Sequence, residues 1–126
     1  PDRYYYTQAL PEYRSLMGGL ACFMIRNPLV LDTNASPQVE MVLRDQASEI
    51  GYRRMVSFIN YSGQNGRSFN EPVEMRDITA QIAWDGRLIQ RVRASVLEID
   101  LPFEVAEGSI YFTLPRLNLF EKVILE

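Results

Sequence analysis

The sequence predicts a mainly β fold: an antiparallel, immunoglobulin-like β-sandwich of about seven strands, preceded by one α-helix. From residue 38 onward, short segments with alternating apolar and polar residues follow one another, which is the pattern of half-buried strands. The helical spacing of apolar residues is confined to the chain before residue 28. With 126 residues, of which 47% are hydrophobic and 23% charged, the chain has the size and composition of one globular domain.

The first predicted element is an α-helix from residue 10 to residue 26. Apolar side chains recur there at steps of three and four residues, and the segment from Ser15 to Ile25 carries no charge. Pro11 suits a first helical turn, and a residue before proline, as at Asn27, favours a helix end. We expect one side of this helix to pack on the sandwich or its linker. The other side should meet an upstream domain of the same polypeptide or a second copy, through Leu16, Met17, Leu20, Phe23 and Met24.

The apolar segment is too short to span a membrane, which needs roughly 20 apolar residues, so we expect it to be buried in protein. Gly18 and Gly19 would then mark a close approach of another backbone. Cys22, the single cysteine, reads as a small buried hydrophobe. The turn-rich residues 32–37 suggest a division into residues 1–36, a lead-in and helix ending a preceding domain, and residues 37–126, the sandwich.

Residues 53–62 are the plainest strand and should lie inside the sheet. Met55, Ser57, Ile59 and Tyr61 would point to one face and Val56, Phe58 and Asn60 to the other, so both faces should be covered. The other predicted strands are residues 39–44, 75–84, 88–97, 101–105, 110–114 and 119–125, with a hairpin turn at Glu107 and Gly108. The expected core comprises Val56, Phe58, Ile78, Ile82, Val92, Phe103, Ile110 and Phe112.

Composition excludes several functions. The chain has no His, the commonest general base and metal ligand, and no second Cys to form a disulfide or help bind zinc. We therefore predict no cofactor and no metal. The formal net charge of −3 gives no electrostatic reason to bind nucleic acid.

Glycosidases need two carboxylates held about 5 to 10 Å apart in a pocket. The nearest candidates are Glu71, Glu74 and Asp77. Glu71 lies beside Pro72 at the approach to a strand, and Asp77 should face outward, so solvated surface or pairing with Arg76 accounts for these residues better than catalysis. We expect no catalytic residue in this chain.

Carbohydrate binding is a stronger alternative, because sugars are bound by exposed aromatic rings with amide neighbours. The loop between the strands at 53–62 and 75–84 supplies Tyr61, Gln64, Asn65 and Phe69. Trp84 is a further candidate beside the turn at Asp85 and Gly86. It also continues the inward face of Ile78, Ala80 and Ile82, so a core position is the simpler interpretation of this residue.

The chain resembles the C-terminal region of beta-galactosidase-like enzymes and related uncharacterised glycoside hydrolases. The matching segments are residues 54–63 (RMVSFINYSG), 71–78 (EPVEMRDI), 101–105 (LPFEV), 112–117 (FTLPRL) and 120–124 (FEKVI). These segments consist mostly of the alternating apolar and polar residues of strands, with a few characteristic polar residues. The resemblance covers nearly everything after Pro37. One departure is Ser57, where many relatives carry His.

In that family a catalytic barrel is followed by an amidotransferase-like domain that helps subunits assemble, and then by a small β-sandwich. The resemblance implies that the helix from residue 10 to residue 26 is the last helix of the preceding domain. It also implies that the catalytic carboxylates lie in the barrel, outside this chain. The expected function is a non-catalytic accessory module of a larger glycoside hydrolase-like protein, acting in domain packing or assembly. The alternatives are a carbohydrate-binding module and an unrelated protein-interaction sandwich.

Overall fold

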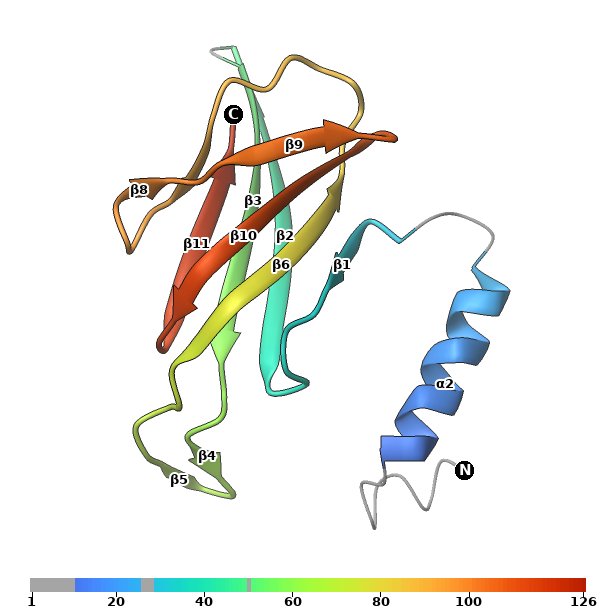
Figure 1. Ribbon diagram of the computed structural model, residues 1–126, viewed down its shortest axis with the longest axis vertical. Coiled ribbons are helices and arrows are strands. Elements are labelled where there is room, and N and C mark those ends of the chain that lie inside the picture. The colour runs from blue at the N-terminus through green and yellow to red at the C-terminus, as the bar shows by residue number, and fades with distance from the viewer. Residues whose placement is uncertain (1–10, 26–28, 50) are drawn as a thin grey trace.

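A computed structural model describes residues 11–25, 29–49 and 51–126. Two antiparallel sheets pack face to face, and one helix stands beside them (Figure 1). Within the described residues, the predicted mainly β sandwich with one N-terminal helix is confirmed; its immunoglobulin-like type stays a prediction. Among the described residues, no helix is both long enough and apolar enough to span a membrane.

The first sheet, sheet A, has four strands in the order β1-β6-β10-β9. Pro115 lies within the last long strand, yet that strand continues past it to Leu117 in one register. The missing proline N–H removes one ladder donor without ending the pairing. The bounds are Leu31–Thr33 for β1, Met75–Ala83 for β6, Phe103–Ala106 for β9 and Ser109–Leu117 for β10.

The second sheet, sheet B, has five strands in the order β2-β3-β11-β7-β8. Their bounds are Val39–Ser48 for β2, Gly51–Asn60 for β3, Val92–Ala94 for β7, Ile99–Asp100 for β8 and Phe120–Leu125 for β11. A separate two-stranded hairpin, β4 (Gln64–Asn65) and β5 (Ser68–Phe69), lies within the loop that joins the two sheets between β3 and β6.

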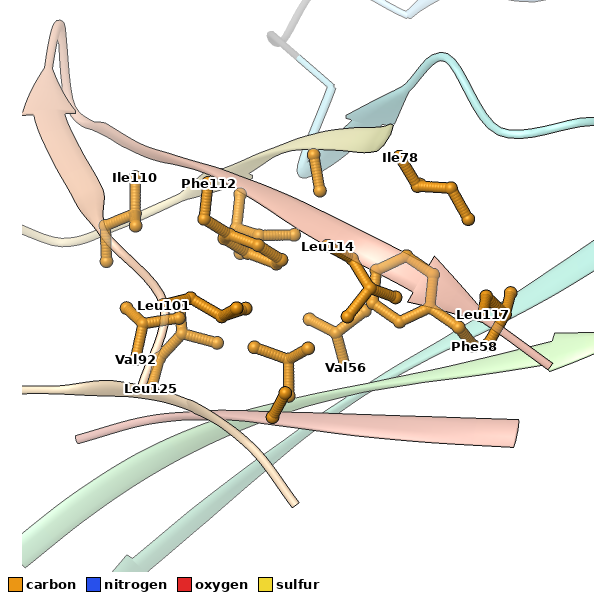
Figure 2. Packing of buried hydrophobic residues seen from close by; sticks show 14 of the residues in the cluster. Val56, Phe58, Ile78, Val92, Leu101, Ile110, Phe112, Leu114, Leu117 and Leu125 are labelled. Atoms are coloured by element: carbon orange, nitrogen blue, oxygen red, sulfur yellow. The ribbon is translucent and has the colours of Figure 1, made fainter. Parts of the chain in front are cut away.

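The core lies between the sheets and is built from the inward residues of both. Figure 2 shows Phe58 of sheet B beside Leu114 and Leu117 of sheet A. Seven of the eight predicted core residues are buried, and Phe103 is half-buried and packs against them. The alternation along β3 is as predicted, with Val56, Phe58 and Asn60 buried. Its outward residues Met55, Ser57 and Ile59 are only half-buried. Of the two faces expected to be covered, only the inward face is fully covered.

Three predicted boundaries are wrong. The predicted strand at 88–97 shrinks to Val92–Ala94, because Gln90 and Arg91 instead donate their N–H groups to the Glu126 carbonyl and residues 95–98 form turns. The strands predicted at 39–44 and 53–62 form one long hairpin whose polar end sequence reasoning left out. Finally, β1 pairs with β6, so the sandwich begins before Pro37.

Arg54, which is ion-paired within sheet B, also ties the two sheets together at the end where β6 finishes. Arg54 on β3 makes two hydrogen bonds to the Asp45 carboxylate, at 2.6 and 2.8 Å, and a third to the Ala83 carbonyl of sheet A. The hydrogen bond from Arg54 is the main reason that the pKa of Asp45 lies below its usual value. Next to this pair, the rings of Tyr52 and Trp84 pack at a centroid distance of 5.7 Å.

Helix α2 (Pro11–Met24) is separate from this core. Leu10 and Arg26, the predicted helix ends, lie outside the described residues. Every α2 side chain that the structure describes is exposed, Phe23 by 87% and Met24 by 78%, so the expected packing of one side on the sandwich is absent. Cys22 is exposed rather than buried. Within the described chain, nothing lies within 4 Å of a Cβ placed on Gly18 or Gly19, so the close backbone approach is also absent.

Candidate functional site

The loop between β3 and β6 holds most of the predicted sugar-binding residues, and buried Asn60 fixes its base. The side chain of Asn60 is 1% exposed and uses both its donor and acceptor atoms. Its amide nitrogen donates to the carbonyls of Val73 at 2.8 Å and Asn118 at 2.7 Å, and its oxygen accepts from the Ser62 N–H at 3.0 Å. One side chain therefore joins the start of the loop, its end and the β10–β11 turn.

Two further residues hold the same loop closed. The Ser62 hydroxyl accepts a hydrogen bond from the Val73 N–H at 2.8 Å, and Asn70 donates its N–H to the Gly63 carbonyl at 2.8 Å. Gly63 is buried, and a Cβ there would collide with the Asn70 carbonyl oxygen. The sequence Asn60-Tyr61-Ser62-Gly63, part of the first matching segment, thus has a structural reason: it orders the loop that follows.

The loop presents Gln64, Asn65 and Phe69 on the β4–β5 hairpin, as the sequence suggested. All three are exposed, Phe69 by 74%, and Gln64 lies directly opposite Phe69 in the hairpin register. Gly66 adopts φ +60°, the left-handed conformation that a tight turn between the two short strands requires. The hairpin can offer an aromatic face and two amides to a ligand. Its role in binding stays a prediction.

Tyr61 is exposed by 39%, but its hydroxyl is already engaged. A hydrogen bond to the Glu40 carboxylate on β2 raises the pKa of Tyr61, because it favours the protonated phenol. Glu40 lies opposite Ile59 on the outward face of sheet B, so Tyr61 is directed toward that face. The Tyr61 hydroxyl is therefore directed away from the hairpin residues with which it was predicted to bind a sugar.

Trp84 lies far from this loop. It follows β6 at the end of the sandwich opposite the β4–β5 hairpin (Figure 1). The side chain is only 7% exposed, and its indole N–H donates to the Arg87 carbonyl at 2.7 Å. Burial removes the ring from a surface where a sugar could stack, in agreement with the simpler interpretation as a core residue.

The three carboxylates considered for catalysis are all exposed. Glu74 pairs with Arg76 at 2.7 Å, whereas the sequence suggested Asp77 as the partner of that arginine. Asp77 has φ +53°, and its carbonyl accepts a hydrogen bond from the Asn34 amide. None of these three carboxylates lines the depressions beside Tyr111, Tyr52 or Arg116, so none of those depressions holds a pair of them.

No family model and no curated protein sequence matches this chain. Among solved structures, the chain is similar to part of alpha-L-fucosidase isoenzyme 2 from Paenibacillus thiaminolyticus, with a TM-score of 0.80, 17% identity and 97% of this chain covered. The fold recurs inside a glycoside hydrolase. It is also similar to part of a cycloisomaltooligosaccharide glucanotransferase from a Paenibacillus species, with a TM-score of 0.59, 17% identity and 75% of this chain covered.

This chain spans only 19% of the fucosidase chain and 16% of the glucanotransferase chain. Identities of 17% show the fold alone. The coarse prediction of a glycoside hydrolase-associated β-sandwich is therefore supported, while the closer resemblance to beta-galactosidase-like enzymes stays a prediction. The fucosidase match covers nearly all of this chain, so the likeness takes in the helix as well as the sandwich.

Sequence reasoning missed the buried polar residues that shape the loops, chiefly Asn60 and Glu121. Both occupy inward positions of strands whose other inward residues are apolar, such as Phe58 before Asn60 and Val123 after Glu121. A polar side chain at such a position must be hydrogen-bonded, because burying it without a partner is costly. A polar residue at an inward position of an otherwise apolar strand face was therefore the signal in the sequence that could have identified Asn60 and Glu121.

Proposed function

We propose that this chain is a non-catalytic accessory module of a larger glycoside hydrolase-like protein and that it acts in domain packing. Helix α2 would be its contact surface, lying against the preceding domain of the same polypeptide. The finer resemblance to beta-galactosidase-like enzymes supports this arrangement, since it makes α2 the last helix of an amidotransferase-like domain.

The exposed apolar surface of α2 is the observation that carries the proposal. Leu16, Met17 and Leu20 are each close to half exposed, and Phe23 and Met24 are more so. Burying a large apolar side chain contributes about 1.5–3 kcal/mol, so covering this surface would stabilise the protein by several kcal/mol. An uncovered apolar surface of this kind favours association. We choose the preceding domain as the partner because helix and sandwich together match one stretch within a much longer enzyme chain.

Hydrogen exchange tests the proposal directly. Amides of residues 11–24 should exchange fast in the isolated chain and slowly in the intact polypeptide, where the helix is covered. The double change Leu20→Glu and Met24→Glu should abolish the protection in the intact polypeptide, because it places two charges in the contact. The matched control Ser15→Glu adds a charge on the opposite side of the same helix and should leave the protection unchanged.

Two results would contradict this assignment. Fast exchange of residues 11–24 in both forms would show that nothing covers the helix. Protection that rises with protein concentration in the isolated chain, and disappears with the double change, would assign the surface to a second copy of the chain.

Carbohydrate binding at the β4–β5 hairpin is the second candidate function. Phe69 supports it, because an aromatic ring exposed by 74% stands on a loop whose base is fully hydrogen-bonded. The glucanotransferase was solved in complex with cycloisomaltoheptaose, so one protein that contains a similar fold binds an oligosaccharide. Glycans that bind on an array should shift the NMR signals of the amides of residues 64–69, and Phe69→Ala should abolish these shifts. Binding that Phe69→Ala leaves intact would remove the hairpin from consideration.

A further inference from the structure

The outward face of sheet A carries a row of polar side chains that the functions above do not use. Asp32 on β1 lies opposite Gln81 on β6, Gln81 lies opposite Tyr111 on β10, and Tyr111 lies opposite Glu104 on β9. Directly opposed residues of an antiparallel sheet share a face, and neighbouring strands are about 4.8 Å apart. The four side chains therefore form a straight row across the whole sheet.

A shallow depression lies along part of this row. Its volume is about 460 Å³, within the usual range for ligand sites, and Asp32, Gln81 and Tyr111 line it. Thr79 and Thr113, which oppose each other one step along the same face, line it as well. In Figure 1, β10 and β6 cross in front of sheet B, so this face is turned toward the viewer.

Some polar groups of the depression are used internally and others are not: Thr33 and Asn34 are hydrogen-bonded within the chain, and one Asp32 carboxylate oxygen accepts from the Thr33 N–H. The Gln81 amide nitrogen donates to the Ser109 hydroxyl at 3.3 Å, which directs its carbonyl oxygen away from Ser109. The hydroxyls of Tyr111, Thr79 and Thr113 have no hydrogen-bond partner in the described part of the chain. A ligand rich in hydroxyl groups could therefore bond to them without breaking internal hydrogen bonds.

The negative charge on the outward face of sheet A favours a neutral ligand over an acidic one. The residues that line the depression include the Asp32 carboxylate and no Arg or Lys, and Glu104 adds a second carboxylate at the end of the row. Carboxylates repel acidic sugars and phosphates, whereas they accept hydrogen bonds from neutral hydroxyls. Tyr111 supplies an aromatic ring, which packs on the apolar side of a sugar.

We infer that the outward face of sheet A binds a neutral oligosaccharide, with Tyr111 as the aromatic contact and Gln81 and Asp32 as hydrogen-bonding residues. This site is separate from the β4–β5 hairpin and from helix α2. It gives the module a binding activity of its own, independent of its role in domain packing.

The test is an NMR titration of the chain with neutral isomalto-, cello- and xylo-oligosaccharides, with oligogalacturonate as the acidic comparison. Binding should shift the amides of residues 79–81 and 111–113. Tyr111→Ala should weaken the affinity at least about tenfold. Tyr111→Phe keeps the ring and should retain most of the affinity. Leu88→Ala, the truncation of a side chain that is 84% exposed in the loop after β6, is the control and should leave the affinity unchanged.

Each other outcome overturns the inference. No shift with any neutral oligosaccharide, or shifts confined to the β4–β5 hairpin, would exclude this face as the site. Tighter binding of oligogalacturonate than of neutral sugars would refute the charge argument. If Tyr111→Ala loses its folded spectrum, Gln81→Ala replaces it, and unchanged affinity in that variant would count equally against the site. None of these results depends on what covers helix α2.

Discussion

Replacing Glu121 with Gln should destabilise the sandwich although the two side chains have nearly the same size and shape. Glu121 is 1% exposed, and its carboxylate accepts three backbone hydrogen bonds. Oε1 accepts from the N–H groups of Val96 at 2.7 Å and Lys122 at 2.9 Å, and Oε2 accepts from Leu97 at 3.0 Å. These bonds hold the turn after β7 against β11, so one side chain fixes the connection from β7 to β8.

The size of the effect follows from these three bonds. An amide at position 121 keeps one carbonyl oxygen but points its NH₂ group at a backbone N–H, which leaves that buried donor unpaired at about 1–3 kcal/mol. The remaining bonds also lose the strength that a charged acceptor gives them. Relief of the cost of burying a charge opposes both effects. We expect a net loss of about 2–4 kcal/mol, a large fraction of the 5–15 kcal/mol typical of a domain.

Equilibrium unfolding in urea measures this loss as a lower midpoint with an unchanged slope. Hydrogen exchange should also speed up at the amides of Val96 and Leu97. Glu49→Gln, the same chemical change at an exposed turn, is the control and should stay within about 0.5 kcal/mol of the parent. If Glu121→Gln is as stable as the parent, the desolvation cost cancels the three hydrogen bonds and the reasoning fails.

Three further predictions concern the core, the Asp45–Arg54 ion pair of sheet B and catalysis. Phe58→Ala should cost about 3–5 kcal/mol in urea unfolding, because the ring is fully buried between the sheets, and a loss below about 1 kcal/mol would contradict the core assignment. Asp45 has a lowered folded pKa, so its contribution is present above about pH 4 and disappears as the pH falls through that folded value. Because the carboxyl is 45% exposed, Asp45→Asn should cost only about 0.2–1 kcal/mol at pH 7, and this cost should shrink as the pH falls below about 4; a cost that does not change with pH would disprove the linkage. The chain should not hydrolyse aryl glycosides, and hydrolysis lost on Glu71→Gln or Asp77→Asn would show otherwise.

The sandwich could be predicted from the sequence because side chains of a strand alternate between its two faces, so the two-residue period shows which residues are buried. Val56 and Phe58, or Ile78, Ala80 and Ile82, can be assigned to the inward face by alternation alone, and all are buried. The same logic failed at 88–97. Alternation continues there, but the carboxylate of Glu121, distant in sequence, captures the N–H groups of Val96 and Leu97 that a strand would have used. A contact between distant residues cannot be read from a local pattern.

The candidate sites show the same limit. Exposed aromatics on the hairpin could be predicted, because a polar loop between two strands must lie at the surface. The row from Asp32 to Glu104 could not, since its four members come from four strands and become neighbours only through the sheet order. Each residue alone reads as an ordinary outward position. Only the register between β1, β6, β10 and β9 places them in one line.

The contrast between the sandwich and the helix bears most on function. Among the described residues, no buried side-chain nitrogen or oxygen lacks a hydrogen bond, and the large apolar residues facing inward are enclosed. The inward side of the sandwich is thus filled and hydrogen-bonded by its own residues. In helix α2, by contrast, Phe23 and Met24 remain mostly exposed, and the solved fucosidase retains a matching stretch of chain within a longer enzyme. A helix that needed no partner would have little reason to be apolar on so much of its surface. The helix gathers several of the exposed large apolar side chains on one element, and this is why we assign the contact with the rest of the protein to the helix and ligand contact to the sheet.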